Sequence, residues 1–392
     1  MMGCFPANVV GLVAGFILLL FLGQICKRGA EAKVAPKRDF LTLYNVDFFD
    51  YVYETAPRMY TAEDIYANLE RARKEGVDVV LWRLSAVGKE TYPSKVRTPL
   101  YEVDEGEFVG TGYRTRANLM GAVLRSYDPL AVATQCAREL GLGIYAWITI
   151  WDDYFPGLQS DFSRRYPHFQ WKDPTGTKYW WGVLSYSHRE VREHRLAQIR
   201  EVAEYDLDGI LLCPRTHSHQ GMHKAQIPHL DQGPFGAAPY GFNEPIVARY
   251  QRLYGIDIRR EPFAVERWDR VKGEFLTLFF KEAKAILQRK GQQLIIGVPF
   301  GNRIPTTPLT IHLDLESWAR KGIADGLILG SGYDLYDLGW EPVAQHLNQV
   351  RAATAQGILV YAWVRLWDWS NRFPGDTKPP AAVARIARKV QE

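Results

Sequence analysis

Leu142 to Ile150 read LGIYAWITI, a short apolar run that begins directly after Gly141. Strands that are buried on both faces of a parallel sheet have this composition, because neither face meets water. A helical pattern from about Asp128 to Leu140 precedes the run, and another from about Arg189 to Tyr205 follows it after a long aromatic loop. This order of helix, strand and helix predicts one repeat of an α/β fold.

The same alternation extends along the chain in both directions. The other predicted strands are Phe40–Val46, Val77–Leu84, Gly209–Cys213, Leu294–Phe300, Gly326–Gly330 and Ile358–Val364. The other predicted helices are 61–75, which opens on a capping box at Thr61, Glu244–Tyr254, Val265–Lys290, Leu315–Lys321, Pro342–Ala355 and Ala381–Val390.

These lengths and this order predict a (β/α)8 barrel of the TIM type with long loops at its carboxyl-terminal mouth, one of them running from Ser85 to about Arg125. The remaining strand is expected within Ile304–Leu313. An open doubly wound sheet is the rival architecture. No Gly-x-Gly-x-x-Gly motif follows the first strand and the sequence holds no P-loop motif, so nucleotide binding lacks its usual support.

The composition is that of an ordinary globular protein with many aromatic residues. Hydrophobic residues make up 47% and charged residues 23% of the 392, which argues against disorder. The net charge of +4, with no long Lys/Arg run, argues against nucleic acid as a partner. The four cysteines include no Cys-x-x-Cys pair and do not predict a disulfide scaffold. The 12 Trp, 21 Tyr and 18 Phe suit either a large core or a site with flat apolar walls.

An internal repeat favours the second of these interpretations, a site with flat apolar walls. Tyr145–Asp152 reads YAWITIWD and Tyr361–Asp368 reads YAWVRLWD, and each segment is followed by Phe-Pro-Gly. Each begins as a strand and ends in a loop, so both Trp-Asp tips are expected at the mouth, where barrel active sites lie. Repeated barrel packing with a turn-forming aspartate is the alternative. A weaker repeat joins Asp208-Gly209-Ile210 to Asp325-Gly326-Leu327.

Two carboxyl groups facing one bond are what glycoside hydrolysis requires. Asp152 and Asp368 are the pair that the repeat offers, with Asp153 as the substitute for Asp152. A carboxyl group among tryptophan side chains is partly desolvated, which raises its pKa and suits a general acid.

Substrate contacts are expected from aromatic rings and from cations at the strand ends. The residues predicted to bind substrate are Arg83, Trp147, Trp151, Arg215, His217, Trp363 and Trp367. The tryptophans could present ring faces to sugar C–H groups, and the arginines could hold hydroxyls or an acidic sugar. An ion pair with a barrel carboxylate is an equally good interpretation of each arginine, and Asp47 after the first strand is open to the same two interpretations.

Two further motifs have competing interpretations. His217 and His219 follow the fourth strand and could bind zinc, but no second ligand group stands out, and we predict neither a metal nor a cofactor. Asn243-Glu244-Pro245 matches the acid/base triplet of many barrel glycosidases, yet no strand precedes it. Asn243 suits a helix N-cap, Glu244 the helix dipole and Pro245 the first turn, so we interpret the triplet as a helix start.

Several segments resemble the glycosyl-hydrolase-like family 10 barrels over roughly residues 40–370. They are GFNEPIV (241–247), YQRLYGID (250–257), RVKGEFLT (270–277), DGI (208–210) and LDLESW (313–318). The resemblance implies a barrel with glycosidase activity on a polysaccharide. Family members often carry an aspartate at the end of the fourth strand, where this chain has Cys213. If that aspartate is the family's nucleophile, this chain either lacks the reaction or performs it with other residues.

The N-terminal segment sets the expected location. Val9 to Cys26 is uncharged and Lys27-Arg28 follow it, whereas a secretory signal carries its positive charge before the apolar run. Charge after the run favours a cytoplasmic side for the rest of the chain, but a barrel that handles carbohydrate usually works outside the cytoplasm. We predict an anchor or signal segment at 1–28, a linker at 29–38 and one domain at 39–392, membrane-anchored or secreted.

The sequence thus predicts a glycoside hydrolase acting on an extracytoplasmic polysaccharide or oligosaccharide. A membrane-tethered barrel that binds carbohydrate without cleaving it is the second hypothesis, and a zinc hydrolase that uses His217 and His219 is the weakest.

Overall fold

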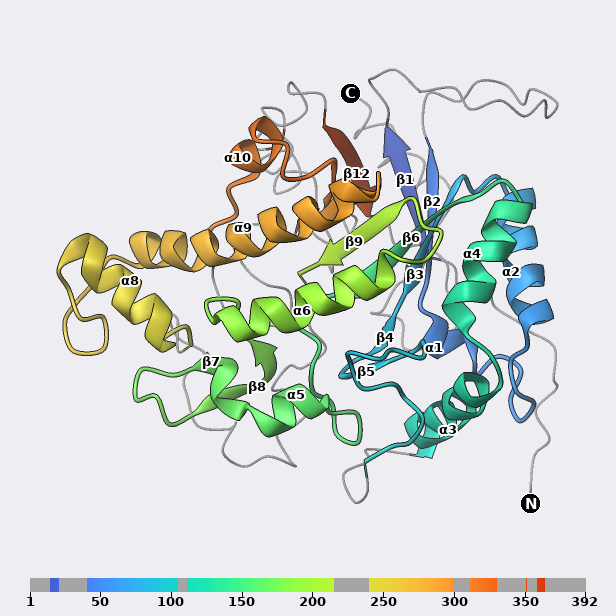
Figure 1. The fold of residues 1–392 in the computed structure, drawn as a ribbon, viewed down its shortest axis with the longest axis horizontal. Coiled ribbons are helices and arrows are strands. Elements are labelled where there is room, and N and C mark those ends of the chain that lie inside the picture. The colour runs from blue at the N-terminus through green and yellow to red at the C-terminus, as the bar shows by residue number, and fades with distance from the viewer. Residues whose placement is uncertain are drawn as a thin grey trace, which may run out of the picture.

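The centre of the molecule is a closed barrel of strands in the order β1-β12-β11-β10-β9-β6-β3-β2 (Figure 1). The structure is a computed structural model, and it describes residues 15–20, 41–104, 111–214, 240–298, 311–329, 350 and 358–363. The barrel strands are β1 (Gly15–Leu20), β2 (Thr42–Val46), β3 (Val79–Arg83), β6 (Gly143–Thr149), β9 (Gly209–Cys213), β10 (Gln293–Val298), β11 (Gly326–Leu329) and β12 (Leu359–Trp363). Every neighbouring pair from β2 round to β12 is parallel, so the chain is an α/β barrel of the TIM type, as predicted.

The position of the eighth strand differs from the prediction. Strand β1 pairs antiparallel with β2, where Leu18 faces Thr42, and with β12, where Ile17 faces Trp363. Residues 311–313, at the end of the segment predicted to hold this strand, are not a strand, and 304–310 lie outside the described residues. A strand that is antiparallel to its neighbours and far from one of them in sequence leaves no trace in the helix–strand alternation. Within the described chain, no helix combines the length and the apolar composition that a membrane crossing requires.

Aspartates at the amino-terminal ends of the strands tie the amino-terminal face of the barrel together. The Oδ2 atoms of Asp78, Asp208 and Asp325 accept hydrogen bonds from the backbone N–H groups of Thr42, Ile144 and Leu294 at 2.7, 2.8 and 2.7 Å. Each acceptor immediately precedes a strand and bonds to the neighbouring one. The Asp-Gly repeat at 208–209 and 325–326 therefore marks this face, which in TIM barrels contributes to stability rather than to catalysis.

Gly209 should tolerate no side chain. A Cβ atom there would lie 2.2 Å from the backbone oxygen of Gln293 and 2.7 Å from the Tyr145 ring. We expect Gly209→Ala to lower the free energy of unfolding by about 1–3 kcal/mol, the usual cost of overpacking. The matched control is Gly326→Ala, whose Cβ would first meet the Tyr361 ring at 3.1 Å. Denaturant titration checks both variants, and an equal loss in the two would contradict this explanation.

Two separate apolar clusters divide the core. The interior of the barrel is filled by Leu43, Leu81, Tyr145, Trp147, Leu211, Cys213, Ile295, Ile328 and Tyr361. The alternate residues of the same strands, such as Tyr44, Trp82 and Ile148, point outward and pack against the helices. This alternation follows from the period of two along a strand.

The helices surround the barrel and begin mostly where their caps predict. They are α1 (Phe48–Tyr51), α2 (Ala62–Lys74), α3 (Thr111–Ser126), α4 (Pro129–Glu139), α5 (Asp161–Arg165), η1 (Pro167–Phe169), α6 (Arg189–Val202), α8 (Glu244–Tyr254), α9 (Val265–Arg289) and α10 (Leu315–Arg320). The capping box at Thr61 is confirmed, because Asp64 Oδ2 accepts from Thr61 N at 2.8 Å and Thr61 Oγ1 accepts from Asp64 N. The predicted helices Pro342–Ala355 and Ala381–Val390 lie, apart from Val350, outside the described residues.

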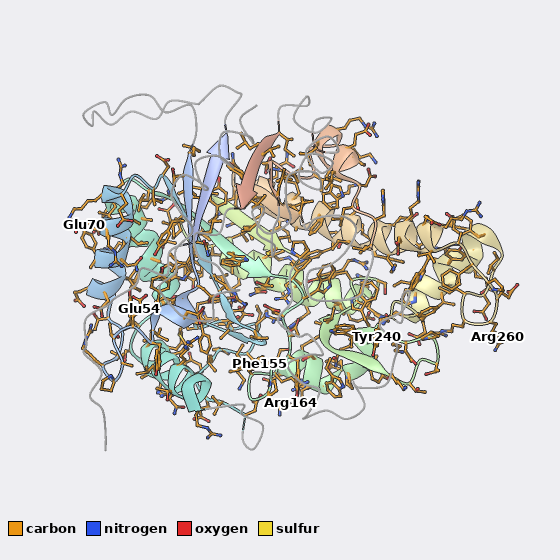
Figure 2. All side chains as sticks on the ribbon, turned by 180° about the vertical axis from the view of Figure 1, so that it is seen from behind. Glu54, Glu70, Phe155, Arg164, Tyr240 and Arg260 are labelled. Carbon is orange, nitrogen blue, oxygen red and sulfur yellow. The ribbon has the colours of Figure 1, made fainter. Side chains whose placement is uncertain are left out.

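The segments beyond the carboxyl ends of the strands carry more regular structure than predicted. The region from Ser85 to Arg125, which we expected to be a loop, contains the hairpin of β4 (Ser85–Ala86) and β5 (Lys89–Glu90) and most of α3. A second hairpin consists of β7 (Gln170–Lys172) and β8 (Tyr179–Leu184). Figure 1 shows α3, α5 and both hairpins below the carboxyl ends of the barrel strands, and Figure 2 shows Phe155 and Arg164 on the same side. This side is the mouth of the barrel.

Helix α8 lies far from the barrel axis, at the outer end of the molecule (Figure 1). Asn243 is its N-cap residue, as predicted, but its side chain makes no capping bond to the helix. The Asn243 Oδ1 atom accepts from Lys172 N at 3.2 Å, and Glu244 pairs with Lys172 at 2.8 Å. The interpretation of Asn243-Glu244-Pro245 as a helix start is confirmed.

Candidate active site

Three charged residues from three strand ends meet at the mouth of the barrel. Arg83 ends β3, Asp47 directly follows β2, and Asp152 lies just beyond β6. The Arg83 guanidinium donates through Nη2 to Asp152 Oδ2 at 2.9 Å and through Nη1 to Asp47 Oδ2. One guanidinium therefore holds two carboxylates, each bound to a different terminal nitrogen.

The burial of the three side chains is unequal. The Asp152 side chain is 0% exposed and that of Arg83 6%, whereas the Asp47 side chain keeps 23% of its surface in contact with solvent. The Arg83 guanidinium also lies over the Trp147 ring, 5.5 Å from its centroid. Trp147 is itself buried in the barrel interior. The site thus has an aromatic floor, a cation above it and two carboxylates of different accessibility.

Electrostatics favour the charged form of Arg83. Burial disfavours the guanidinium, but Asp47 and Asp152 outweigh this effect and raise the pKa of Arg83 above its ordinary value. The sequence led us to expect a carboxyl at position 152 that is desolvated by tryptophans alone. The ion pair with Arg83, which was the alternative interpretation of that arginine, instead suits Asp152 to act as an ionised group.

Asp153 points away from the mouth into a buried ion-pair network. Its carboxylate accepts from Arg97 Nη2 and from Arg195 Nη2, each at 2.9 Å, and its side chain is 0% exposed. Its backbone N–H donates to Gly182 O at 3.1 Å, and its carbonyl accepts from Ser160 N at 3.0 Å. Asp153 therefore fixes the chain next to Asp152, and in this arrangement its carboxylate cannot take the place of the Asp152 carboxylate at the mouth.

The network joins three segments that are far apart in sequence. Glu90 on β5 accepts from Arg97 Nε at 2.5 Å and from Gln198 Nε2 of α6 at 2.9 Å. Burial raises the pKa of Glu90, although Arg97 and Arg195 oppose that shift. The two arginines and the carboxylates of Glu90 and Asp153 balance in charge, which is what allows all four to be buried. This network holds the β4–β5 hairpin, the segment after β6 and α6 together.

His194 borders the network and gives a prediction for acid stability. It stacks on Phe162 with ring centroids 4.0 Å apart and lies 2.8 Å from Arg97 Nη1. Burial, with the positive charges of Arg97 and Arg195, lowers its pKa from 6.5 to about 2. Because the unfolded chain then binds more protons below pH 6.5, stability decreases as the pH falls through 6.5, by about 2 kcal/mol at pH 5.

We expect His194→Gln, which keeps an acceptor for Arg97, to remove that contribution. The difference in unfolding free energy between pH 7 and pH 5 should become smaller by about 2 kcal/mol. Denaturant titration at the two pH values measures it. His168→Gln, at an exposed histidine, is the control and should leave the difference unchanged. An unaltered pH dependence in His194→Gln would contradict the assignment.

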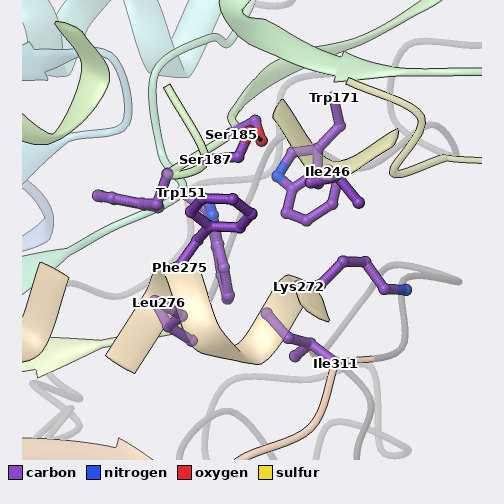
Figure 3. A pocket seen from close by; sticks show the side chains of 10 residues that line it. Trp151, Trp171, Ser185, Ser187, Ile246, Lys272, Phe275, Leu276 and Ile311 are labelled. Carbon is purple, nitrogen blue, oxygen red and sulfur yellow. Dashed lines mark hydrogen bonds between the residues drawn. The ribbon is translucent and has the colours of Figure 1, made fainter. Parts of the chain in front are cut away.

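Trp151 occupies the core outside the barrel rather than the mouth. It is 0% exposed and lines a small cavity with Trp171 and Lys272 (Figure 3). The cavity volume of about 10 Å³ is enough for one water molecule and far too small for a sugar. The Trp151-Asp152 tip was expected at the mouth of the barrel. The strand ends at Thr149, so the period of two no longer applies at Trp151.

The other predicted site residues fall largely outside the described part of the chain. Arg215, His217, Trp367 and Asp368 lie outside the described residues, and of Trp363 only the backbone, at the end of β12, is described. Among the residues that are described, no group of three or more His, Cys, Asp and Glu side chains is arranged to hold a metal ion. Cys213, which stands where the resembling family often has aspartate, is the last residue of β9, and its side chain is 1% exposed in the barrel interior.

Two polar residues of the mouth escaped the sequence interpretation. Asn45 on β2 and Thr149 on β6 share the inward-facing parity of Leu43 and Trp147. A polar residue at an inward position near the carboxyl end of an otherwise apolar strand is a signal that could have identified both.

Fold and site together define a TIM-type barrel with paired carboxylates at its mouth. No protein-family model matches the chain, and no curated protein sequence does, so membership of glycosyl-hydrolase-like family 10 stays a prediction. Solved structures do match, and the neighbours are glycoside hydrolases with TIM-type folds.

One of them is the PgaB (BpsB) glycoside hydrolase domain from Bordetella bronchiseptica, which is 14% identical with a TM-score of 0.55 over 89% of this chain and 90% of that one. The β-galactosidase from the psychrophilic Marinomonas ef1 is 12% identical with a TM-score of 0.39, covering 73% of this chain and 40% of its own. The α-L-fucosidase isoenzyme 2 from Paenibacillus thiaminolyticus is 12% identical with a TM-score of 0.46, covering 89% and 49%. This chain thus spans less than half of the latter two proteins. The likeness to the Bordetella domain supports the fold.

Proposed function

We propose that the protein is a glycoside hydrolase whose active site is the mouth formed by Asp47, Arg83 and Asp152. The observation that carries the proposal is the pair of carboxylates on one guanidinium, above a tryptophan, at the end of the barrel where TIM-barrel enzymes place their catalytic groups. The structural neighbours are glycoside hydrolases, which supports the general class.

The roles follow from charge and access. Hydrolysis adds the oxygen of water to the anomeric carbon, breaks the bond from that carbon to the bridging oxygen, and delivers a proton to the departing oxygen. Asp152, ionised beside Arg83, suits the group that attacks the sugar or takes the proton from water. The proton donor is Asp368 in our proposal, from the second YAWxxxWD segment. Asp47, partly exposed and bound to the same arginine, is the second candidate for that role.

A barrel that binds carbohydrate without cleaving it is the competing proposal. The complete burial of the Asp152 side chain and the presence of Cys213 at the end of β9 favour it, because both reduce the number of carboxylates available at the mouth.

A hydrolysis and binding screen separates the two proposals. The full chain is incubated with 4-nitrophenyl glycosides of galactose, fucose, glucose and N-acetylglucosamine, and with their oligosaccharides, while nitrophenolate and new reducing ends are measured. Binding of the same sugars is followed by calorimetry. Release of nitrophenolate or of new reducing ends from any of these sugars supports the hydrolase. Binding of a sugar without release supports the barrel that only binds carbohydrate. A protein that neither cleaves nor binds any of them would contradict both proposals.

The location is a separate proposal. We propose that residues 9–26 direct the chain to or across a membrane, on the basis of their uncharged apolar composition. Gly15–Leu20 also form β1, so a chain anchored through this segment would leave β2 and β12 without their shared neighbour. Fractionation of cells that express the full chain, beside a variant that starts at residue 36, tests the proposal. Recovery of both in the soluble cytoplasmic fraction would contradict it.

A further inference from the structure

The floor of the barrel mouth contains buried polar atoms that form no hydrogen bond with any described residue. The Thr149 side chain is 1% exposed, and its Oγ1 has no hydrogen-bond partner among the residues that the structure describes. The same holds for the buried Oδ1 atom of Asn45. A polar atom that is removed from water without a partner is destabilising, so proteins retain few such atoms, and these are often found at functional sites.

Both atoms belong to the inner surface of the barrel near its carboxyl end. Thr149 is level with Cys213 on β9 in the strand register and lies two residues beyond Trp147 on β6. Asn45 follows Leu43 on the inner face of β2 and is two residues before Asp47. Their neighbours on these strands are therefore the residues of the charged site, Trp147 and Asp47.

The chemistry of the two atoms selects a class of ligand. The amide oxygen of Asn45 only accepts hydrogen bonds, whereas a threonine hydroxyl donates or accepts. A ligand that satisfies Asn45 Oδ1 must itself donate, which a phosphate dianion or a carboxylate cannot do. A sugar ring donates and accepts through each of its hydroxyl groups.

We propose that Thr149 and Asn45 bind hydroxyl groups of the sugar ring that enters the mouth, and that they thereby determine specificity. This inference rests on the proposed carbohydrate function and adds the residues that recognise the hydroxyl groups of the sugar. A site that is built to hydrogen-bond a substrate hydroxyl discriminates strongly against analogues that lack it, because the buried polar groups are then left unpaired.

Stability gives the first half of the test. Thr149→Val removes the hydroxyl at nearly constant volume, and we expect the variant to be as stable as the wild type or more so, because no hydrogen bond to a described residue is lost. The matched control is Thr134→Val on α4, whose buried hydroxyl donates to Ala131 O at 2.8 Å. That variant should lose about tenfold in the folding equilibrium constant. A comparable loss in Thr149→Val would overturn the proposal, because its hydroxyl would then have a structural partner.

Sugar binding gives the second half. Calorimetry with the monosaccharides galactose, fucose, glucose and N-acetylglucosamine, and with their tetrasaccharides, is carried out on the wild type, Thr149→Val, Thr149→Ser and Thr134→Val. We expect Thr149→Val to bind about tenfold more weakly, and Thr149→Ser, which keeps the hydroxyl, to recover most of the affinity. Thr134→Val should bind like the wild type.

The outcomes separate this proposal from the one on which it rests. If the wild type binds a sugar and Thr149→Val binds it equally well, the subsite is wrong while the carbohydrate function stands. If the wild type binds none of the sugars, the proposed function is refuted and the subsite with it.

Discussion

Asp152→Asn is expected to lower kcat for glycoside hydrolysis by about 10²–10⁴-fold while KM changes little. Asparagine keeps the shape and one acceptor oxygen for Arg83, but it can neither attack as a carboxylate nor accept a proton from water. The substrate should still bind, because Arg83, Trp147 and Asp47 are unchanged. The measurement is steady-state release of reducing ends from whichever glycoside the wild type cleaves.

The control for this variant is Asp206→Asn, which removes a carboxylate from an exposed ion pair with Arg138 at the opposite end of the barrel. It should retain full activity, since it touches no residue of the mouth. Circular dichroism and thermal unfolding on both variants separate a catalytic loss from a folding loss. Turnover within a few-fold of the wild type in Asp152→Asn would remove Asp152 from the reaction.

Arg97→Met is expected to lower the free energy of unfolding by about 3–5 kcal/mol, because it leaves the two buried carboxylates of Glu90 and Asp153 with a single counter-charge, Arg195. Arg97 is 1% exposed at its side chain and bonds to Glu90 Oε1 at 2.5 Å and to Asp153 Oδ1 at 2.9 Å. Methionine fills much of the same space, so the loss reports charge rather than a cavity. Urea titration with a double-mutant cycle against Glu90→Gln measures the coupling between the two side chains.

Two comparisons sharpen the Arg97 prediction. Arg200→Met removes an exposed ion pair with Glu193 and should cost less than about 1 kcal/mol. The double variant Arg97→Met/Glu90→Gln should recover part of the loss, since one uncompensated charge is gone. A loss no larger than that of Arg200→Met would mean that the network contributes nothing beyond a surface pair.

The parallel part of the barrel could be predicted from the sequence because its strands are short, apolar and separated by helical patterns. The predicted Gly209–Cys213 is reproduced without change, and the predicted Leu142–Ile150 contains the whole of β6. Strand β1 could not be predicted, because its residues read equally well as an apolar anchor and its pairing is antiparallel. The helix α3 was missed because the Gly and Tyr residues around it are typical of a loop.

Only those residues of the candidate site that lie at strand ends could be predicted from the sequence. Arg83 ends one buried strand and Asp152 follows another, so their meeting at the mouth could be anticipated from topology. The burial of Asp153 in an ion-pair network could not be anticipated. Its two partners, Arg97 and Arg195, lie in an insertion and on α6, and no local sequence pattern indicates that these segments contact the end of β6. Trp151 was misplaced for a related reason: the chain turns after Thr149, and parity along a strand says nothing about a residue in the turn.

A crystal structure of Asp152→Asn soaked with the oligosaccharide that the wild type cleaves tests the central claim most directly. We predict an intact sugar chain at the carboxyl-terminal mouth, with one ring within hydrogen-bond distance of Asp47 and of the amide at position 152. A sugar bound on another face of the molecule, with the mouth empty and the Arg83 ion pairs unchanged, would contradict it.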